Sequence, residues 1–218
     1  MAVKKAQAVV RTTSGAVGET VHTDGRRARG ERTRLAVLDA LLHLVEQGEL
    51  RPTAQAVAEE AGVALRTVYH HFEDVEALRR MALDLQLRRH GELLAPVDPK
   101  ADLGDRIHLV ARQCRKLFEA VTPIRRAAMF DEQSSPDMAE GLRRARLVRR
   151  NFVTAAFATE LAKRSADGRT LHDAIDAATS WESWYYTRSS LDRSAAAAEK
   201  ILALTLHDLL TGRSTSGR

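Results

Sequence analysis

Apolar residues recur at steps of three and four positions along most of the chain after residue 31. Leu35, Leu38, Leu42 and Val45 form the first such series. This spacing places the apolar side chains on one face of an α-helix. No stretch shows a convincing alternation with a period of two, the pattern of a half-buried strand. The pattern therefore predicts an all-α protein without a sheet.

Two of the predicted helices are short and follow each other closely. Thr53 stands at the N-cap position of a helix over 54–61, and Gly62 ends that helix after about two turns. Val68 and Phe72 mark the inward face of the next helix. Two short helices joined by a tight turn that contains glycine make a helix-turn-helix unit.

Longer helices follow this unit. Asp74 can cap a fourth helix, which runs toward the break at Pro96. Beyond Pro99 four or five more helices are predicted, with Pro123 and Gly168 among the residues that end them. The approximate ranges are 102–121, 124–133 (a short piece), 138–163, 170–187 and 195–210. The predicted organisation is an arm over 1–30, a helix-turn-helix domain over 31–91 and a helical domain over 100–212.

The positive charge is concentrated at the N-terminus. The chain has a net charge of +5, and residues 1–34 hold eight Lys and Arg against three Asp and Glu, so the rest of the chain is balanced. With few large apolar residues, this segment cannot bury enough surface to fold alone. We therefore expect residues 1–30 to form a flexible basic arm, in which Arg27 and Arg29 are candidates to bind DNA. Composition alone is equally compatible with a solubilising tail.

The stretch from Thr53 to Phe72 resembles the DNA-binding signature of the TetR family of bacterial transcriptional regulators. Its Ala-Gly-Val turn, Thr-x-Tyr pair and His-Phe ending occur in register. The resemblance covers about residues 31–91, and it implies an N-terminal three-helix DNA-binding domain followed by a helical ligand-binding and dimerisation domain. Ala64 departs from the family pattern, because Ser or Thr is common there, and the recognition helix thereby loses an N-cap hydroxyl.

In a unit of this kind the second short helix enters the major groove of DNA. Arg66 is the candidate for reading a guanine, because a guanidinium can donate two hydrogen bonds to its O6 and N7 atoms, and Leu65 could touch a thymine methyl. The hydroxyls of Thr53, Thr67 and Tyr69 suit phosphate oxygens, and the resemblance implies the same role for Thr67 and Tyr69. The alternative for Tyr69 is a partly buried core position. The candidate DNA-contacting residues are Thr53, Ala64, Leu65, Arg66, Thr67, Tyr69, His70, Arg27 and Arg29.

The neighbours His70 and His71 do not suggest a metal site. Adjacent residues of a helix do not share a face, so we expect His70 to face DNA and His71 to pack or cap within the domain. No cofactor is expected.

The expected partner is a double-stranded, near-palindromic DNA operator, bound by a homodimer, because one unit covers only a few base pairs. The last two predicted helices offer a seam for a four-helix bundle between two copies. Its residues would be Ala174, Ala177, Ala178, Leu202, Leu206, Leu209 and Leu210. The alternative is that this apolar stripe packs only within the subunit.

If the resemblance holds, the helical domain also binds a small-molecule effector of unknown class. Aromatic residues suit the walls of such a pocket, although each could equally be ordinary core. The candidates are Phe118, Phe130, Phe152, Trp181, Trp184 and Tyr185. The arginine-rich run over 143–150 is expected to be a solvated helix face rather than a second anion site.

Several classes of protein are disfavoured. The chain has no Gly-rich phosphate loop, nucleophile elbow or HExxH motif, so we do not expect an enzyme. Its single cysteine, Cys114, excludes an intrachain disulfide framework and favours the cytoplasm, and no apolar run approaches the ~20 residues that span a membrane.

The expected function is a ligand-responsive transcriptional regulator, most simply a repressor. The alternatives are an architectural DNA-binding protein that uses the basic arm without sequence preference, and a helical interaction protein.

Overall fold

The computed structural model describes residues 18–163 and 168–212. Within these residues the chain forms ten α-helices and one short 3-10 helix, with no strand, which confirms the all-α prediction. The helices are α1 (Gly18–Glu46), α2 (Ala54–Glu60), α3 (Leu65–His71), α4 (Val75–His90), η1 (Gly91–Leu93), α5 (Leu103–Ala128), α6 (Pro136–Ala156), α7 (Ala158–Lys163), α8 (Gly168–Ala178), α9 (Trp181–Ser189) and α10 (Ala195–Thr211).

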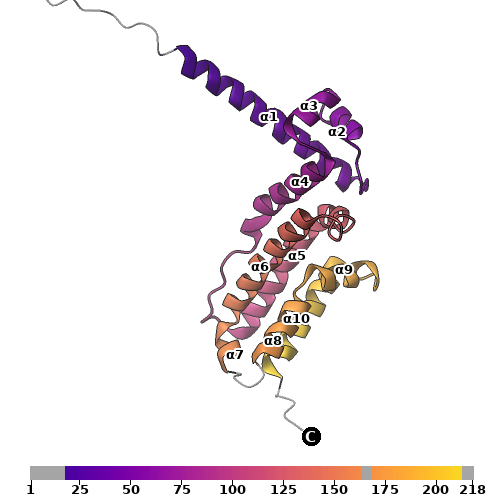
Figure 1. Ribbon diagram of the computed structural model, residues 1–218. Coiled ribbons are helices and arrows are strands. Elements are labelled where there is room, and N and C mark those ends of the chain that lie inside the picture. Colours follow the sequence, from indigo (N-terminus) through magenta and orange to yellow (C-terminus); the bar gives the residue numbers. More distant parts are fainter. Residues whose placement is uncertain (1–17, 164–167, 213–218) are drawn as a thin grey trace, which may run out of the picture.

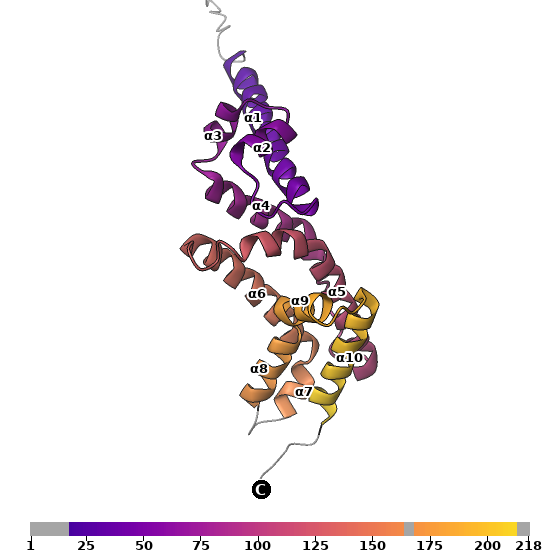
Figure 2. The ribbon, with the colours of Figure 1, turned by 90° about the vertical axis from the view of Figure 1, so that its right-hand side faces the viewer.

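The molecule is elongated, with α1–α3 at one end and α7, α8 and α10 toward the other (Figures 1 and 2). Helix α4 leads from the first group to the second, and α5 contacts α1, α4, α6, α9 and α10. Because both α1 and α4 pack on α5, the buried apolar residues form one continuous core through the whole length. The predicted boundary between residues 91 and 100 stays a prediction.

The first helix is longer than the sequence pattern indicates. It begins at Gly18 rather than near Glu31, so residues 18–30 are helical and the prediction of a flexible arm is wrong for them. The apolar pattern begins only near Leu35, because the earlier turns pack against little else and carry no apolar face for the pattern to reveal. The rest of the predicted arm, residues 1–17, lies outside the described residues.

Pro123 does not end a helix, contrary to expectation. Helix α5 continues through it to Ala128 and so includes residues 124–128 of the predicted short helix, while residues 129–133 form turns. Proline removes one backbone N–H from the helix ladder. Next to it, the Thr122 hydroxyl donates to the Phe118 carbonyl (2.5 Å) and accepts from Trp181 Nε1 (3.0 Å), which ties this turn to α9.

Two helices that were predicted as continuous are each broken by a polar contact. The predicted helix over 138–163 is interrupted at Phe157, where Arg106 Nη1 donates to the Ala156 carbonyl (2.7 Å). The predicted helix over 170–187 is interrupted at Thr179, and Ser180 caps the helix that follows by accepting from the Ser183 N–H (3.1 Å). The partner Arg106 is distant in sequence, so the first break has no local signal.

Candidate nucleic-acid interface

The turn between α2 and α3 forms as predicted. The Thr53 hydroxyl accepts from the Ala56 N–H (3.1 Å) at the start of α2. At its end the Val63 N–H donates to the Ala58 carbonyl (2.9 Å), and Gly62 takes a φ of +64°, a value that an L side chain rarely adopts. This closed turn fixes the angle between the two short helices.

Helix α3 exposes one face and buries the other. Val68 and the following Phe72 are 2% and 3% exposed, and they pack into the core with Val57 and Leu78. Apolar burial on one side of a short helix is what holds it against the domain. The opposite face of α3 is therefore presented to solvent.

The predicted base-contacting residues lie on this exposed face. Leu65 and Tyr69 are 37% and 51% exposed, and Arg66 and His70 are also exposed. Tyr69 is therefore not a core tyrosine. Thr67 is half-buried at the edge of the face.

A predicted contact residue precedes each of the two short helices. Ala64 is the N-cap and makes no side-chain capping hydrogen bond, as the sequence predicts. Thr53 is exposed at the start of α2, and its hydroxyl still has its own O–H to donate after accepting the cap bond.

His71 does not share the exposed face. It is half-buried, and its Cε1 lies 3.9 Å from the position that a Cβ on Gly30 of α1 would occupy. Burial lowers the pKa of His71, and the neighbouring His70 and Arg34 lower it further, so the ring stays neutral near pH 7. Among the described side chains, no group of three His, Cys, Asp or Glu could hold a metal ion.

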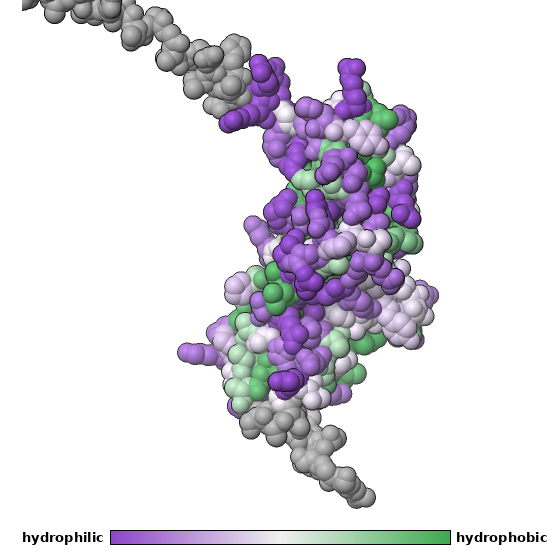
Figure 3. All heavy atoms as spheres, viewed as in Figure 1, coloured by the Kyte–Doolittle hydropathy of each residue, from purple (hydrophilic) through white to green (hydrophobic). Residues whose placement is uncertain are grey.

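Arg27 and Arg29 are exposed, but on the helical turns of α1 rather than on a flexible arm. These turns project beyond α2 and α3 in both views (Figures 1 and 2). Hydrophilic residues cover the turns beside the grey segment in Figure 3.

Ion pairs connect α4 to the rest of the molecule. Arg79 donates through Nε (2.5 Å) and Nη2 (3.1 Å) to Asp131, which follows α5 and is 4% exposed. Arg51, in the loop before α2, places a second guanidinium 3.8 Å from the same carboxylate, and Arg80 pairs with Asp137 at the start of α6. The α5–α6 corner is thus bound to the helix that carries the helix-turn-helix unit.

The predicted effector residues do not converge on one cavity. Phe118 and Trp181 line a small cavity of about 70 Å³ between α4, α5, α6 and α9. Phe118 and Trp184 line a surface groove of about 450 Å³ between α9 and α10, and Tyr185 lines a separate cleft with Trp184 beside α5.

Phe130 and Phe152 line neither this cavity nor the groove and cleft beside it, and their role at an effector site stays a prediction. Phe130 is 54% exposed after α5, beside Arg51, and Phe152 is half-buried on α6. Other residues that line the small cavity were not predicted from sequence: Leu83 and Leu87 of α4, and three arginines, Arg125, Arg146 and Arg149. The four-residue spacing of the two leucines was the available signal.

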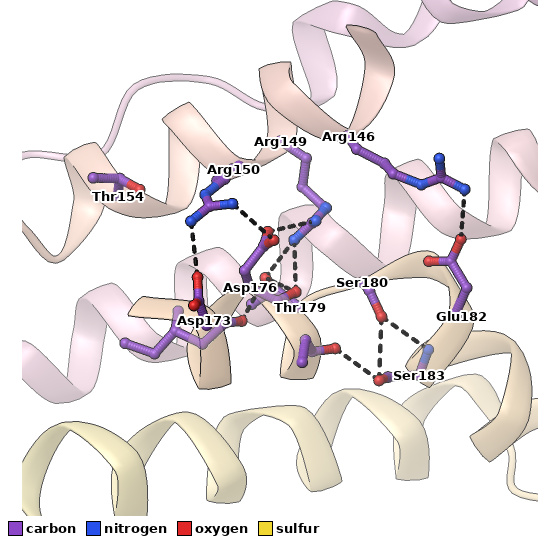
Figure 4. Close-up of polar contacts among 12 residues, drawn as sticks. Arg146, Arg149, Arg150, Thr154, Asp173, Asp176, Thr179, Ser180, Glu182 and Ser183 are labelled. Atoms are coloured by element: carbon purple, nitrogen blue, oxygen red, sulfur yellow. Dashed lines mark hydrogen bonds and ion pairs between the residues drawn. The ribbon is translucent and has the colours of Figure 1, made fainter. Parts of the chain in front are cut away.

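The arginine-rich run of α6 is not simply a solvated face. Arg149 is 6% exposed, donates to Thr179 Oγ1 (2.6 Å) and pairs with Asp176 (2.7 Å) (Figure 4). Arg146 bridges Glu132 (2.6 Å) and Glu182 (3.3 Å). Arg143 and Arg144 are exposed, as expected of a solvated face.

The leucine stripe of α10 packs inside the subunit. Leu202, Leu206 and Leu210 are at most 7% exposed, and α10 lies along α5, so the predicted dimer seam is wrong for these residues. The apolar residues that α9, α10 and their connection leave in solvent are Tyr186, Leu191, Ile201 and Leu204. No helix in the described part of the chain is long and apolar enough to cross a membrane.

No family model and no curated protein matches the sequence of this chain. Solved structures do match the fold. A TetR-family transcriptional regulator from Rhodococcus sp. superposes with a TM-score of 0.65 at 17% identity, over 83% of this chain and 100% of that one. A transcriptional regulator from Rhodococcus sp. Rha1 gives 0.63 at 20% identity, over 84% and 96%. A TetR-family regulator from Mesorhizobium loti MAFF303099 gives 0.58 at 15% identity, over the same shares of the two chains. The chain therefore has the fold of these regulators.

Proposed function

We propose that the protein is a ligand-responsive DNA-binding transcriptional regulator that binds a near-palindromic operator as a homodimer and represses by occupying it. The observation that carries this proposal is the orientation of α3. Val68 and the adjoining Phe72 face the core, and the opposite face is left in solvent on a helix narrow enough for the major groove. This exposed face carries Leu65, Arg66, Tyr69 and His70.

The roles within this surface follow from side-chain chemistry. Arg66 is proposed to read guanine, and Leu65 to contact a thymine methyl. The hydroxyls of Thr53, Thr67 and Tyr69 donate to phosphate oxygens, which positions α3 without reading sequence. His70, one turn beyond Arg66, adds a further donor on the same face.

The dimer is proposed to use the exposed side of α9 and α10. Tyr186, Leu191, Ile201 and Leu204 are large apolar residues left in solvent there, and three of them line the 450 Å³ groove. An apolar patch of this kind is typical of a surface that pairs with another protein. A second copy is the occupant that the two half-sites of a palindrome require.

The effector is proposed to bind in the small cavity between α4, α5, α6 and α9. A cavity of about 70 Å³ is far smaller than the ~300 Å³ of an ordinary ligand site, so an occupant has to displace the walls. Leu83 and Leu87 of α4 form one wall. Because α4 carries the helix-turn-helix unit, a ligand that prefers the widened cavity shifts the position of α3.

The test is a gel-shift titration of the full chain against DNA that flanks its own gene and against random duplex of equal length at the same salt. We expect tighter binding to one flanking fragment, because only the ratio of the two affinities measures specificity. Equal binding to both, with a steep salt dependence, would instead favour a non-specific architectural protein. If the protein binds neither DNA, the result would favour a helical interaction protein.

Two variants sharpen the same assay. Arg66→Ala should lose ~1–3 kcal/mol of discrimination at one base pair of the half-site. Tyr69→Phe removes a phosphate contact and should weaken binding to all DNA sequences about equally. Arg143→Ala, an exposed arginine on α6, is the matched control for lost charge. Discrimination that survives Arg66→Ala would mean that another residue reads the base.

A further inference from the structure

The projecting turns of α1 carry charge that no described side chain neutralises. From residue 25 to residue 34 the helix has five arginines and one carboxylate, Glu31. Glu31 pairs with Arg34, which turns toward the domain and lies over the Phe72 ring. Arg26, Arg27, Arg29 and Arg32 are exposed and have no ion pair with a side chain that the structure describes.

Helical geometry places two of these arginines on the face that meets α3. Gly30 approaches His71 at the end of α3, so Gly30 marks that face. Residues three and four positions earlier in a helix lie on the same face, and these are Arg27 and Arg26. At 100° per residue, Arg32 lies on the opposite face, and Arg29 is turned to the flank.

The two arginines extend the charged surface of the helix-turn-helix unit in one direction. Arg66 and His70 are exposed on α3, and Arg26 and Arg27 follow on α1 about one helical turn, ~5 Å, beyond the contact with His71. A polyanion that follows α3 would meet them next. Duplex DNA has this form, because its phosphates continue along the groove that a recognition helix enters.

We propose that the turn of α1 that carries Arg26 and Arg27 is a second DNA contact, which binds backbone phosphates just outside the groove occupied by α3. This proposal rests on the proposed function. In this proposal the arginines are held on a helix rather than on a flexible arm. The packing of α1 on α2, α4 and α5 sets the direction of that helix. The contact positions the protein and lengthens its footprint, and it carries no base preference.

The direct test is the salt dependence of binding to a duplex selected from a random library with the full chain. For Arg26→Gln/Arg27→Gln, the slope of log K against log salt should become shallower by about 3.6, since the homodimer loses four phosphate contacts and each is worth about 0.9. Preference among sequences should stay unchanged. Arg32→Gln, on the opposite face of the same helix, is the matched control and should leave the slope as it is.

A second variant separates a helical contact from a flexible one. Ala28→Pro breaks the helix between the two arginines and the rest of α1, yet leaves the remaining helix to begin with proline at a tolerated first position. If the helix holds the arginines in place, this variant should lose as much slope as the double variant. A flexible arm would bind as well as before, and that result would overturn the helical contact.

The length of the DNA gives an independent readout. The duplex is shortened by about two base pairs at each end, outside the bases that α3 contacts. This change should weaken DNA binding by wild type and leave binding by Arg26→Gln/Arg27→Gln unaffected. Specific binding by wild type with equal slopes for the double variant and Arg32→Gln would refute this contact and leave the proposed function standing. If wild type binds no duplex better than random DNA, both proposals fail.

Discussion

Two groups of arginines in this molecule serve different purposes. The first group is exposed and without ion pairs to the described side chains, and it comprises Arg66 on α3 and, on the projecting turns of α1, Arg26, Arg27, Arg29 and Arg32. Those in the second half of α6 are bound to acids of α8, α9 and the α5–α6 corner. Arg150, for example, pairs with Asp173 and donates to His172 Nδ1 (2.7 Å).

The difference lies in the neighbours rather than in the arginines. Both groups are arginine-rich runs on helices, and the run over 143–150 is the denser of the two. The acids that neutralise Arg146, Arg149 and Arg150 lie 14 to 36 residues away in sequence, so the run alone does not reveal them. A basic run therefore indicates a nucleic-acid surface only where the folded chain leaves it without acidic partners.

Among the substitutions that test this difference, Arg149→Met should have the largest effect on the free energy of unfolding. The substitution removes a buried cation that Asp176 and Thr179 satisfy, and breaking a buried pair from one side costs about 3–5 kcal/mol. The free energy of unfolding should fall by this amount in urea. Arg143→Met, exposed on the same helix, should change it by less than about 0.5 kcal/mol. Equal losses would mean that the α6 arginines are not held by their partners.

A smaller effect is expected at the junction between the two regions. Asp131→Asn keeps the shape of the side chain but removes the charge that Arg79 and Arg51 share, at a cost of about 1.5–3 kcal/mol in unfolding free energy. Asp137→Asn, whose exposed carboxylate pairs with Arg80, is the control and should cost under about 1 kcal/mol. If the junction also transmits the effector signal, Asp131→Asn should change operator affinity while Asp137→Asn changes it less.

A third substitution, Ala64→Ser, tests how the start of α3 is stabilised in the DNA-binding region. A hydroxyl at this N-cap can accept from a free N–H in the first turn of α3, which should stabilise the fold by about 1 kcal/mol. Ala196→Ser, exposed in the first turn of α10, is a suitable control because Ser194 already caps that helix. An unchanged melting temperature for Ala64→Ser would show that the start of α3 is held by its tertiary contacts alone.

The smallest effect should appear in acid. Hydrogen bonds from Arg106 hold the pKa of Glu160 below its usual range in the folded protein. The stability that this pair contributes is therefore present above the ordinary glutamate pKa and is lost as pH falls through the lower folded value. Glu160→Gln should flatten the fall of unfolding free energy below about pH 5 relative to wild type. Parallel curves would contradict this assignment.

The helix-turn-helix unit could be predicted from sequence because its signals are local. Thr53 and Asp74 cap helices, and Gly62 takes the backbone conformation that ends α2. Val68 and Phe72 define which side of α3 is buried. Each of these depends on residues within a few positions, so a single sequence carries them.

The rest of the fold depends on partners that are distant in sequence. The Arg106 guanidinium donates to the Ala156 carbonyl at the α6–α7 break. Beside Pro123, the Thr122 hydroxyl donates to the Phe118 carbonyl and accepts from Trp181 of α9. The leucines of α10 look the same whether they meet α5 of their own chain or a second copy. The candidate α3 face was therefore predictable residue by residue, whereas the cavity, the ion pairs and the exposed side of α10 were not.

Cys114 offers a practical route to the geometry of the bound state. It is the only cysteine of the chain and fully buried on α5, where burial raises its pKa to about 12, so its thiol stays protonated and unreactive. A cysteine introduced at His70 would then be the one that a maleimide dye or spin label modifies. In a dimer, the distance between two such labels reports the separation of the two α3 helices. The measurement does not require a cysteine-free variant first.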